Sequence, residues 1–439
     1  MSGVSFLRRV SLHGFRGSLS RSKSNEPQPE MDQPPSQQPL VLPKTQTVLL
    51  LHAARQPYDL TEDYPVPELR DDHEVLVRTR AIGLNPVDWK APELGGDIVH
   101  QRQSSRLKVL VISTDYRDLR KSTYQHYVVG LDYNTVRLPP TLSYEEGSTL
   151  GVAFVAAALS LGVCMGLDFS SILDGPDLYT LLRQLPSDVF AADIRDECLN
   201  STRSHERAQS GDWLAVWGGS STSANLTIQL ARLAGLRTIA VADTAKHGLR
   251  LTHHRSVRPD LLVDSHDPAR AVAVIRANTN AKGGGRLRFA IDTRGKESAG
   301  WLAQALSGDS VQHGKDSATT GAPPSPPGTP DESSAANSDD GSESSSSLTS
   351  SAHLIGLTGL PKERVTECVV YHTVPIKLFH EVPAVGRALV EWLERLLARG
   401  LVLPPDIIDV ERGLGSVNQG LDRMRRGEIS GGKLVVRVD

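Results

Sequence analysis

The sequence predicts an α/β protein in which a parallel β-sheet is covered by helices on both faces. The first observation is residues 211–233, where a turn leads into the apolar run Trp213–Trp217, a loop of small residues and an amphipathic helix. The second is that four further short apolar runs follow, and helical patterns alternate with them. Buried parallel strands have nearly continuous apolar sequences, and helices connect them. The alternation therefore predicts a doubly wound sheet.

The loop after the first apolar run has the composition of a phosphate-binding turn. Small residues let the backbone approach a pyrophosphate, and the N-terminus of the next helix supplies free N–H groups and a favourable dipole. The glycine fingerprint is imperfect, because Ser221 and Ala224 stand where G-x-x-G-x-x-G spacing would place glycines. Together with the strands that follow, the loop indicates a Rossmann-type dinucleotide-binding domain. Its candidate phosphate-binding residues are Gly218, Gly219, Ser220, Ser221, Thr222 and Ser223.

The second strand is expected at 236–242 and ends before Asp243, about 20 residues after the loop, where an acid would bind a ribose 2′-hydroxyl. Asp243 favours NAD(H), whereas Lys246 could pair with the 2′-phosphate of NADP(H), so the cofactor preference stays open. Further strands are expected at 260–264, 287–292 and 353–357, and a helix at 268–279. The residues expected to face the nicotinamide half are Thr293, Gly356, Leu357 and Thr358.

Length and composition exclude several function classes. The chain of 439 residues is long enough for about two domains. A net charge of −3 offers no electrostatic reason to expect nucleic-acid binding. Cys164, Cys198 and Cys368 are far apart, so neither a Cys-x-x-Cys metal site nor a disulfide framework is expected, and no metal is predicted. Residues 149–167 are uncharged but small, which favours a buried helix over a membrane span.

Three tracts depart from the regular pattern. Residues 1–25 are basic and contain no acid, which is typical of a mitochondrial presequence and equally of a basic tail, so the expected compartment is cytoplasmic or mitochondrial. Residues 1–40 as a whole are expected to be a disordered segment with a linker. Residues 307–352 are rich in Ser, Pro and acids and are expected to be a disordered insert. Residues 168–209 have mixed composition and are expected to be an irregular insert, with a helical pattern at 178–185.

The segments that flank the dinucleotide-binding unit point to a family. Strands expected at 47–51, 74–78 and 79–83 lead into the string NPVDWK at 85–90. The pattern P-x-x-L-S-x-E-E-x-x-T-L follows, and GGSS then precedes the long helix. In this order the motifs resemble the medium-chain dehydrogenase/reductase superfamily, in particular the zinc-independent branch of quinone oxidoreductases and fungal trans-acting enoyl reductases. The resemblance covers residues from about 41 to 306 and from 353 to 439.

The resemblance implies a GroES-like β-barrel domain at 41–150, a Rossmann NAD(P)-binding domain at 151–374 and a return to the first domain at 375–439. It also implies an active site between the two domains and hydride transfer from NAD(P)H to a small-molecule substrate, an activated alkene or a quinone. Homodimers are common in the family. Asn85 and Asp88 lie at the turn that faces the family's cleft and are the candidate catalytic residues, although Asn-Pro also favours a plain turn.

One departure from the family pattern lies at residues 91–110. About two strands that complete the barrel in the family have no clear counterpart there. The alternative interpretation is therefore a catalytically impaired nucleotide-binding relative that acts as an interaction protein. A zinc alcohol dehydrogenase is a poorer interpretation, because no zinc ligand set can be assigned.

Overall fold

The computed structural model describes residues 42–53, 56–86, 88, 107–113, 118–279, 286–307, 351–364 and 368–438. Residues Met1–Leu42 form a separate unit from Pro43–Asp439, and the description below concerns the second unit. The tracts expected to be disordered, 1–40 and all but the ends of 307–352, lie outside the described residues. Most of the expected shortening at 91–110 lies outside them too.

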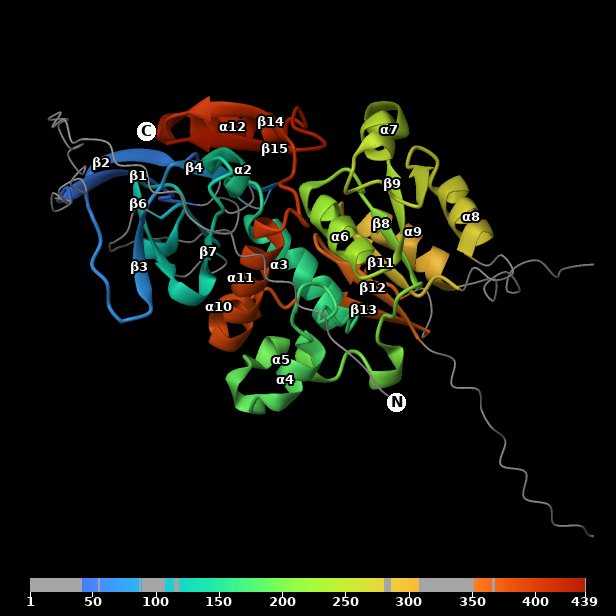
Figure 1. The fold of residues 1–439 in the computed structure, drawn as a ribbon. Helices are drawn as coiled ribbons and strands as arrows, with labels where there is room; N and C mark the ends of the chain where they lie inside the picture. Colours follow the sequence, from blue (N-terminus) through green and yellow to red (C-terminus); the bar gives the residue numbers. More distant parts are fainter. Residues whose placement is uncertain are drawn as a thin grey trace, which may run out of the picture. The chain divides into compact units, whose positions relative to one another are not determined.

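A six-stranded parallel sheet forms the core of the α/β region (Figure 1). Its order is β10-β9-β8-β11-β12-β13, which is 3-2-1-4-5-6 in the order of the chain and is the doubly wound dinucleotide-binding order. The direction of winding reverses between β8 and β11, so a ligand crevice is expected beyond the carboxyl ends of these two strands. The strands are β8 (Trp213–Trp217), β9 (Arg237–Ala242), β10 (Leu261–Asp264), β11 (Phe289–Asp292), β12 (Ala352–Gly356) and β13 (Val369–Thr373).

Helices cover both faces of this sheet. On one face, Leu214 and Val216 of β8 share an apolar core with helices α3 (Gly151–Leu159) and α6 (Thr222–Leu233). On the other face, the alternate residues of β8 pack against α8 (Pro268–Thr279) and α9 (Lys296–Ser307). Successive strand residues point to opposite faces, so the whole of β8 is buried. This explains why its sequence is continuously apolar.

The stretch 168–209 contains two helices, α4 (Leu178–Gln184) and α5 (Ala192–Leu199), where an irregular insert was expected. Helix α4 lies within the predicted helical pattern, whereas α5 was not foreseen, because Ile194 and Cys198 are its only buried residues. The apolar side chains of this stretch join the core that α3 and α6 form. The insert is therefore a packed part of that core.

The β-rich region is built from short antiparallel pairs and one mixed sheet. The pairs are β1 (Thr45–Leu50) with β2 (Asp59–Pro65), β3 (Glu74–Arg78) with β6 (Tyr127–Leu131), and β5 (Val109–Val111) with β7 (Thr135–Arg137). In the mixed sheet, β15 (Lys433–Arg437) lies between β14 (Ile407–Arg412) and β4 (Ala81–Gly83). Two strands from the C-terminal part of the chain thus form one sheet with β4 from its N-terminal part.

The remaining helices connect or cover these sheets. Helix α11 (Pro383–Ala398) buries Leu389 and Trp392 in the same core as α3 and β7. Within the described part of the chain, no helix combines the length and apolar character needed to cross a membrane. The other helices are α2 (Tyr144–Ser148), α7 (Thr244–His253), α10 (Leu378–Glu381) and α12 (Val417–Arg425).

Candidate functional site

The loop between β8 and α6 has the close backbone approach that a dinucleotide phosphate needs. Gly218 has a φ of +78°, and a Cβ at this position would overlap Oγ1 of Thr293 and lie 2.9 Å from Cγ of Arg294. A Cβ on Gly219 would lie 2.7 Å from Cβ of Ala240 on the neighbouring strand β9. Both glycines donate their backbone N–H to the carbonyl of Val241, at 3.0 and 2.9 Å. Side chains are therefore excluded where the loop passes the end of the sheet.

The N-terminus of α6 follows directly. Ser221 is its N-cap, and the Ser221 hydroxyl accepts a hydrogen bond of 3.1 Å from the backbone N–H of Ala224. Thr222 and Ser223 are the first two helical residues, whose N–H groups have no carbonyl partner within the helix. The hydroxyl of Ser221 also lies 3.0 Å from that of Thr293 at the end of β11. The loop and the end of β11, which the sequence placed at the same site, meet across the point where the winding reverses.

Thr293 is engaged within the loop. Its hydroxyl lies 3.1 Å from the carbonyl of Trp217 and 3.2 Å from that of Gly218, so it holds β8 and the loop together. At the end of the neighbouring strand β12, a Cβ on Gly356 would lie 2.7 Å from Cγ of Leu360. Leu357 is half-buried and Thr358 is exposed. Their roles toward the nicotinamide stay a prediction.

Asp243 follows β9 and caps helix α7. Its Oδ1 accepts a hydrogen bond of 2.9 Å from the backbone N–H of Lys246, while Oδ2 lies 3.6 Å from Nε2 of His266. Asp243 is half-buried and Lys246 is exposed. The carboxylate that was expected to bind a ribose hydroxyl thus also has a structural function as the N-cap. Both residues lie where predicted, and neither decides between NAD(H) and NADP(H).

Asn85 and Asp88, the two candidate catalytic residues, lie together. Oδ2 of Asp88 accepts a hydrogen bond of 2.6 Å from the backbone N–H of Asn85. The side-chain amide of Asn85 donates to the carbonyl of Gly83 at 3.3 Å. Its Oδ1 accepts a hydrogen bond from Nζ of Lys433, at the start of β15. The sequence did not identify Lys433, and its only local signal is a single lysine that opens a closing strand whose next three residues are apolar.

Burial perturbs both charged groups of this cluster. Burial lowers the pKa of Lys433 to about 8, although the Asp88 carboxylate acts in the opposite direction. Burial raises the pKa of Asp88, against the hydrogen bond from Asn85 and the charge of Lys433. Tyr58 and Tyr124 pack edge to face beside the cluster, with ring centroids 5.2 Å apart, and the Tyr58 hydroxyl donates to the Asp88 carbonyl at 3.2 Å. A lysine that ionises near neutral pH can both give and receive a proton.

A chain of contacts connects this cluster to the loop between β8 and α6. The backbone N–H of Lys433 donates to the carbonyl of Asp406 at 2.8 Å. The Asp406 carboxylate pairs with Arg250 of α7 at 2.7 Å, and Arg250 also donates to the carbonyl of Ser220 at 3.3 Å. Next to this path, Nε2 of His247 lies 2.9 Å from the hydroxyl of Ser430. The polar cluster and the candidate cofactor loop, the loop between β8 and α6, are therefore joined through one arginine.

The comparisons with known proteins agree with this architecture. The chain is 29% identical to the trans-enoyl reductase caaB of Aspergillus niger over 272 residues, which are 57% of this chain and 64% of that protein. It is 24% identical over 403 residues to a trans-enoyl reductase of Gibberella fujikuroi, with 85% and 93% of the two chains covered. It is 23% identical over 445 residues to the trans-enoyl reductase buaC of Petromyces alliaceus, with 90% and 98% covered. No family model matches the chain.

Solved structures show the same fold. The CurK enoyl reductase superposes with a TM-score of 0.56 at 14% identity, with 90% of this chain and 99% of that chain covered. A quinone oxidoreductase of Pseudomonas syringae superposes with a TM-score of 0.55 at 12% identity, with 89% and 99% covered. These findings confirm the predicted family resemblance, fold class and oxidoreductase enzyme class. The chain thus has the fold of the medium-chain dehydrogenase/reductase oxidoreductases and is similar in sequence to the trans-enoyl reductases.

Proposed function

We propose that this protein is an NAD(P)H-dependent reductase of a carbon–carbon double bond conjugated to a carbonyl group. The observation that carries the proposal is Lys433, which lies beside Asn85 and Asp88 and is joined through Asp406 and Arg250 to the cofactor loop. Reduction of such an alkene requires a hydride at the β-carbon and a proton at the α-carbon. The names of the related trans-enoyl reductases support the same acceptor class.

The residues of the loop suit a nicotinamide dinucleotide. Gly218 and Gly219 admit no side chain, which lets the loop pass close to Thr293 and Ala240, and the first N–H groups of α6 have no carbonyl partner within the helix, which suits a phosphate. Gly218 to Ser223 would hold the pyrophosphate, and Asp243 or Lys246 would contact the adenosine ribose. When bound, the reduced nicotinamide supplies the hydride.

The chain's own residues would handle the proton. After the β-carbon has received the hydride, the substrate carries an enolate, and the ammonium group of Lys433 would give a proton to its α-carbon. Asn85 holds the lysine through its Oδ1, and Asp88 keeps an opposite charge in the cluster. The neutral lysine then takes a proton from solvent. Burial lowers the pKa of Lys433 to about 8. This value is close to the working pH, where proton transfer is efficient.

A test compares acceptors and variants in one assay. Full-length protein is mixed with NADPH or NADH and either a short trans-2-enoyl thioester or a quinone, and oxidation of the cofactor is followed. We expect turnover of the thioester, and Lys433→Met is expected to lower its kcat by about 10²–10⁴-fold, the usual contribution of a general acid. Lys433→Arg is the matched variant that keeps the charge but cannot give up its proton, and it is expected to be equally slow.

The same experiment defines how the proposal fails. If the folded protein binds the cofactor but oxidises it only with quinones, the alkene acceptor is wrong. If Lys433→Met keeps the wild-type kcat, Lys433 is not the proton donor. The comparisons offer no support for the alternative of a non-catalytic relative. Homodimerisation and the cellular compartment stay predictions.

A further inference from the structure

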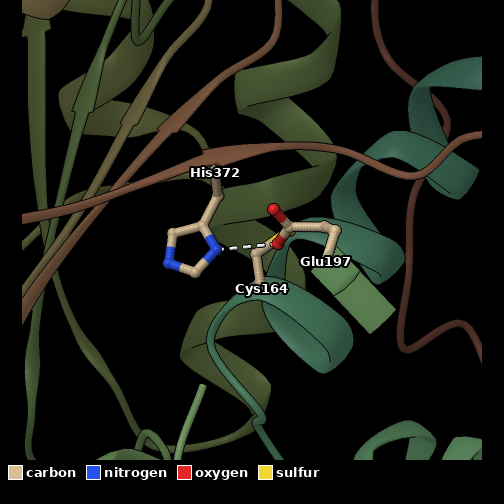
Figure 2. A group of neighbouring side chains, drawn as sticks. All are labelled: Cys164, Glu197 and His372. Carbon is tan, nitrogen blue, oxygen red and sulfur yellow. Dashed lines mark hydrogen bonds and ion pairs between the residues drawn. The ribbon is translucent and has the colours of Figure 1, made fainter. Parts of the chain in front are cut away.

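A second cluster of polar side chains lies buried away from the residues above. Figure 2 shows Cys164, Glu197 and His372 converging from three separate elements. Cys164 ends the π-helical turn Ser160–Cys164 (η3), Glu197 lies on α5 and His372 lies on β13. One potential ligand atom from each residue lies within 4.8 Å of the other two. Cys164 and the His372 side chain are fully buried, and the Glu197 side chain is 15% exposed.

We propose that Cys164, Glu197 and His372 form a zinc-binding site that ties the 168–209 insert to the edge strand of the parallel sheet. The donor set is one thiolate, one carboxylate and one imidazole, which are the three ligand types that Zn²⁺ takes in proteins. A solvent water would complete a tetrahedral site from the side where Glu197 reaches the surface. The site is distinct from the Asn85–Asp88–Lys433 cluster and plays no part in hydride transfer.

Charge balance supports a divalent cation at this position. A thiolate from Cys164 and a carboxylate from Glu197 together carry two negative charges, and a divalent cation neutralises both. Burying a net charge is costly, whereas a neutral assembly avoids most of that penalty. On binding, the Cys164 thiol releases its proton to solvent as the sulfur–metal bond forms. No electron transfer is involved.

The surroundings of His372 are those of an oriented metal ligand. Its Nδ1 faces Oε1 of Glu197 at 2.7 Å, and its Nε2 lies 2.9 Å from Nδ1 of the buried His353 on β12. The two imidazole rings are stacked, with centroids 5.1 Å apart. A ligating histidine typically uses its second nitrogen in a hydrogen bond that fixes its tautomer and orientation. His353 would accept that bond, which leaves the Nδ1 lone pair of His372 directed at the metal.

The required movement is small. Ligand atoms around a tetrahedral zinc ion lie roughly 3.3–3.7 Å apart, given bond lengths of about 2.0–2.3 Å. The His372–Glu197 separation of 2.7 Å must widen by several tenths of an ångström, and the sulfur must close from a separation of at most 4.8 Å. Glu197, as the most exposed of the three, can make this adjustment by rotating its side chain.

The test measures metal content and ligand identity in the full chain. Protein made without a polyhistidine tag is stripped with chelator, equilibrated with ZnCl₂, desalted and analysed for metal. We expect one zinc ion per chain in the wild type, and loss of that ion in Cys164→Ser and His372→Gln. Cys198→Ser, a buried neighbour, and Cys368→Ser, an exposed thiol, are the matched controls and should keep it.

A second measurement uses only the wild type, so its result does not depend on whether the variants fold. Cobalt(II) added to the stripped wild type should produce a thiolate-to-cobalt charge-transfer band, which disappears when excess zinc is added. If the wild type takes up no zinc, or if the cobalt complex lacks the thiolate band, the cluster is only a group of hydrogen-bonded side chains and the proposal is wrong. Zinc uptake that Cys164→Ser leaves intact would place the metal elsewhere and would contradict it equally.

Discussion

Replacement of Gly218 by alanine should damage the loop more than the same replacement at a glycine with similar backbone geometry. Gly218 and Gly211 have φ values of +78° and +92°, so an L-residue is strained at both. A Cβ on Gly211 meets nothing within 4 Å, whereas a Cβ on Gly218 overlaps Oγ1 of Thr293. Gly211→Ala therefore isolates the backbone strain, and Gly218→Ala adds a collision at the candidate cofactor site.

The two costs can be estimated separately. A left-handed conformation costs an L-residue about 1–2 kcal/mol, and this should be the whole loss in unfolding free energy for Gly211→Ala. Overpacking adds about 1–3 kcal/mol, so Gly218→Ala should lose about 2–5 kcal/mol. Thr293 must also move, which breaks its contact with Ser221 at the start of α6. We therefore expect cofactor affinity to fall at least about tenfold, which corresponds to about 1.4 kcal/mol.

The assay combines denaturant unfolding with a cofactor titration that follows tryptophan fluorescence, to which Trp217 contributes from the end of β8 directly before the loop. Thr293→Ala removes the oxygen that the new Cβ would strike. In the double variant with Gly218→Ala, part of the lost stability should return as a favourable coupling energy. If Gly218→Ala is no less stable than Gly211→Ala and binds the cofactor like the wild type, the assignment of this loop is wrong.

Four further predictions test other parts of the structure. Because only protonated Lys433 can donate a proton and its pKa is about 8, kcat for an enoyl thioester should fall as the pH rises through about 8, and Lys433→Met should lack this limb. The pKa of the same lysine is about 8 in the folded chain and about 10.5 in the unfolded chain, so between these values the unfolded chain binds more protons. The contribution of Lys433 to the free energy of unfolding should therefore rise with pH in this window. Tm measurements on the wild type and Lys433→Met as a function of pH check the sign. Asp243→Ser keeps an N-cap for α7 but removes a negative charge. The ratio of NADH to NADPH affinity, measured by titration, should therefore shift toward NADPH by about tenfold. An unchanged ratio would mean that Asp243 acts only as the N-cap. Trp392→Phe removes the hydrogen bond of 3.0 Å from Nε1 to the carbonyl of Ile172 and loosens the contact with Phe169, so the free energy of unfolding should fall by about 2–4 kcal/mol; a loss under about 0.5 kcal/mol would show that the insert is not held there.

The parallel sheet could be predicted largely from the sequence because its strands are buried on both faces. The predicted run Trp213–Trp217 coincides with β8, and the runs expected at 236–242 and 260–264 differ from β9 and β10 by a single residue at the start. Such continuous apolar sequences have few other structures open to them. Strand β13 was not predicted, because the polar residue His372 interrupts its apolar sequence. Only the structure shows that this side chain is buried in contact with Glu197 and His353.

The candidate site could be predicted where its residues are close in the chain or, like Thr293, follow directly after a strand of the predicted parallel sheet. The loop residues Gly218 and Ser221 are separated by a few positions, so a local pattern identifies them. Asn85 and Lys433 are 348 positions apart, and only the pairing of β4 with β15 brings them together. The same holds for Arg250, whose contacts with Asp406 and Ser220 depend on tertiary structure. Pairings of this kind leave no periodic signal in a single sequence.

The most direct test of the proposed reaction follows the hydride itself. Full-length protein is incubated with NADPH or NADH that carries deuterium at both hydrogen positions of C4 of the nicotinamide, together with a short trans-2-enoyl thioester, and the product is analysed by NMR and mass spectrometry. The account predicts one deuterium at the β-carbon and a solvent-derived proton at the α-carbon. A folded protein that binds the cofactor but leaves no deuterium in the thioester with either deuteride would contradict it.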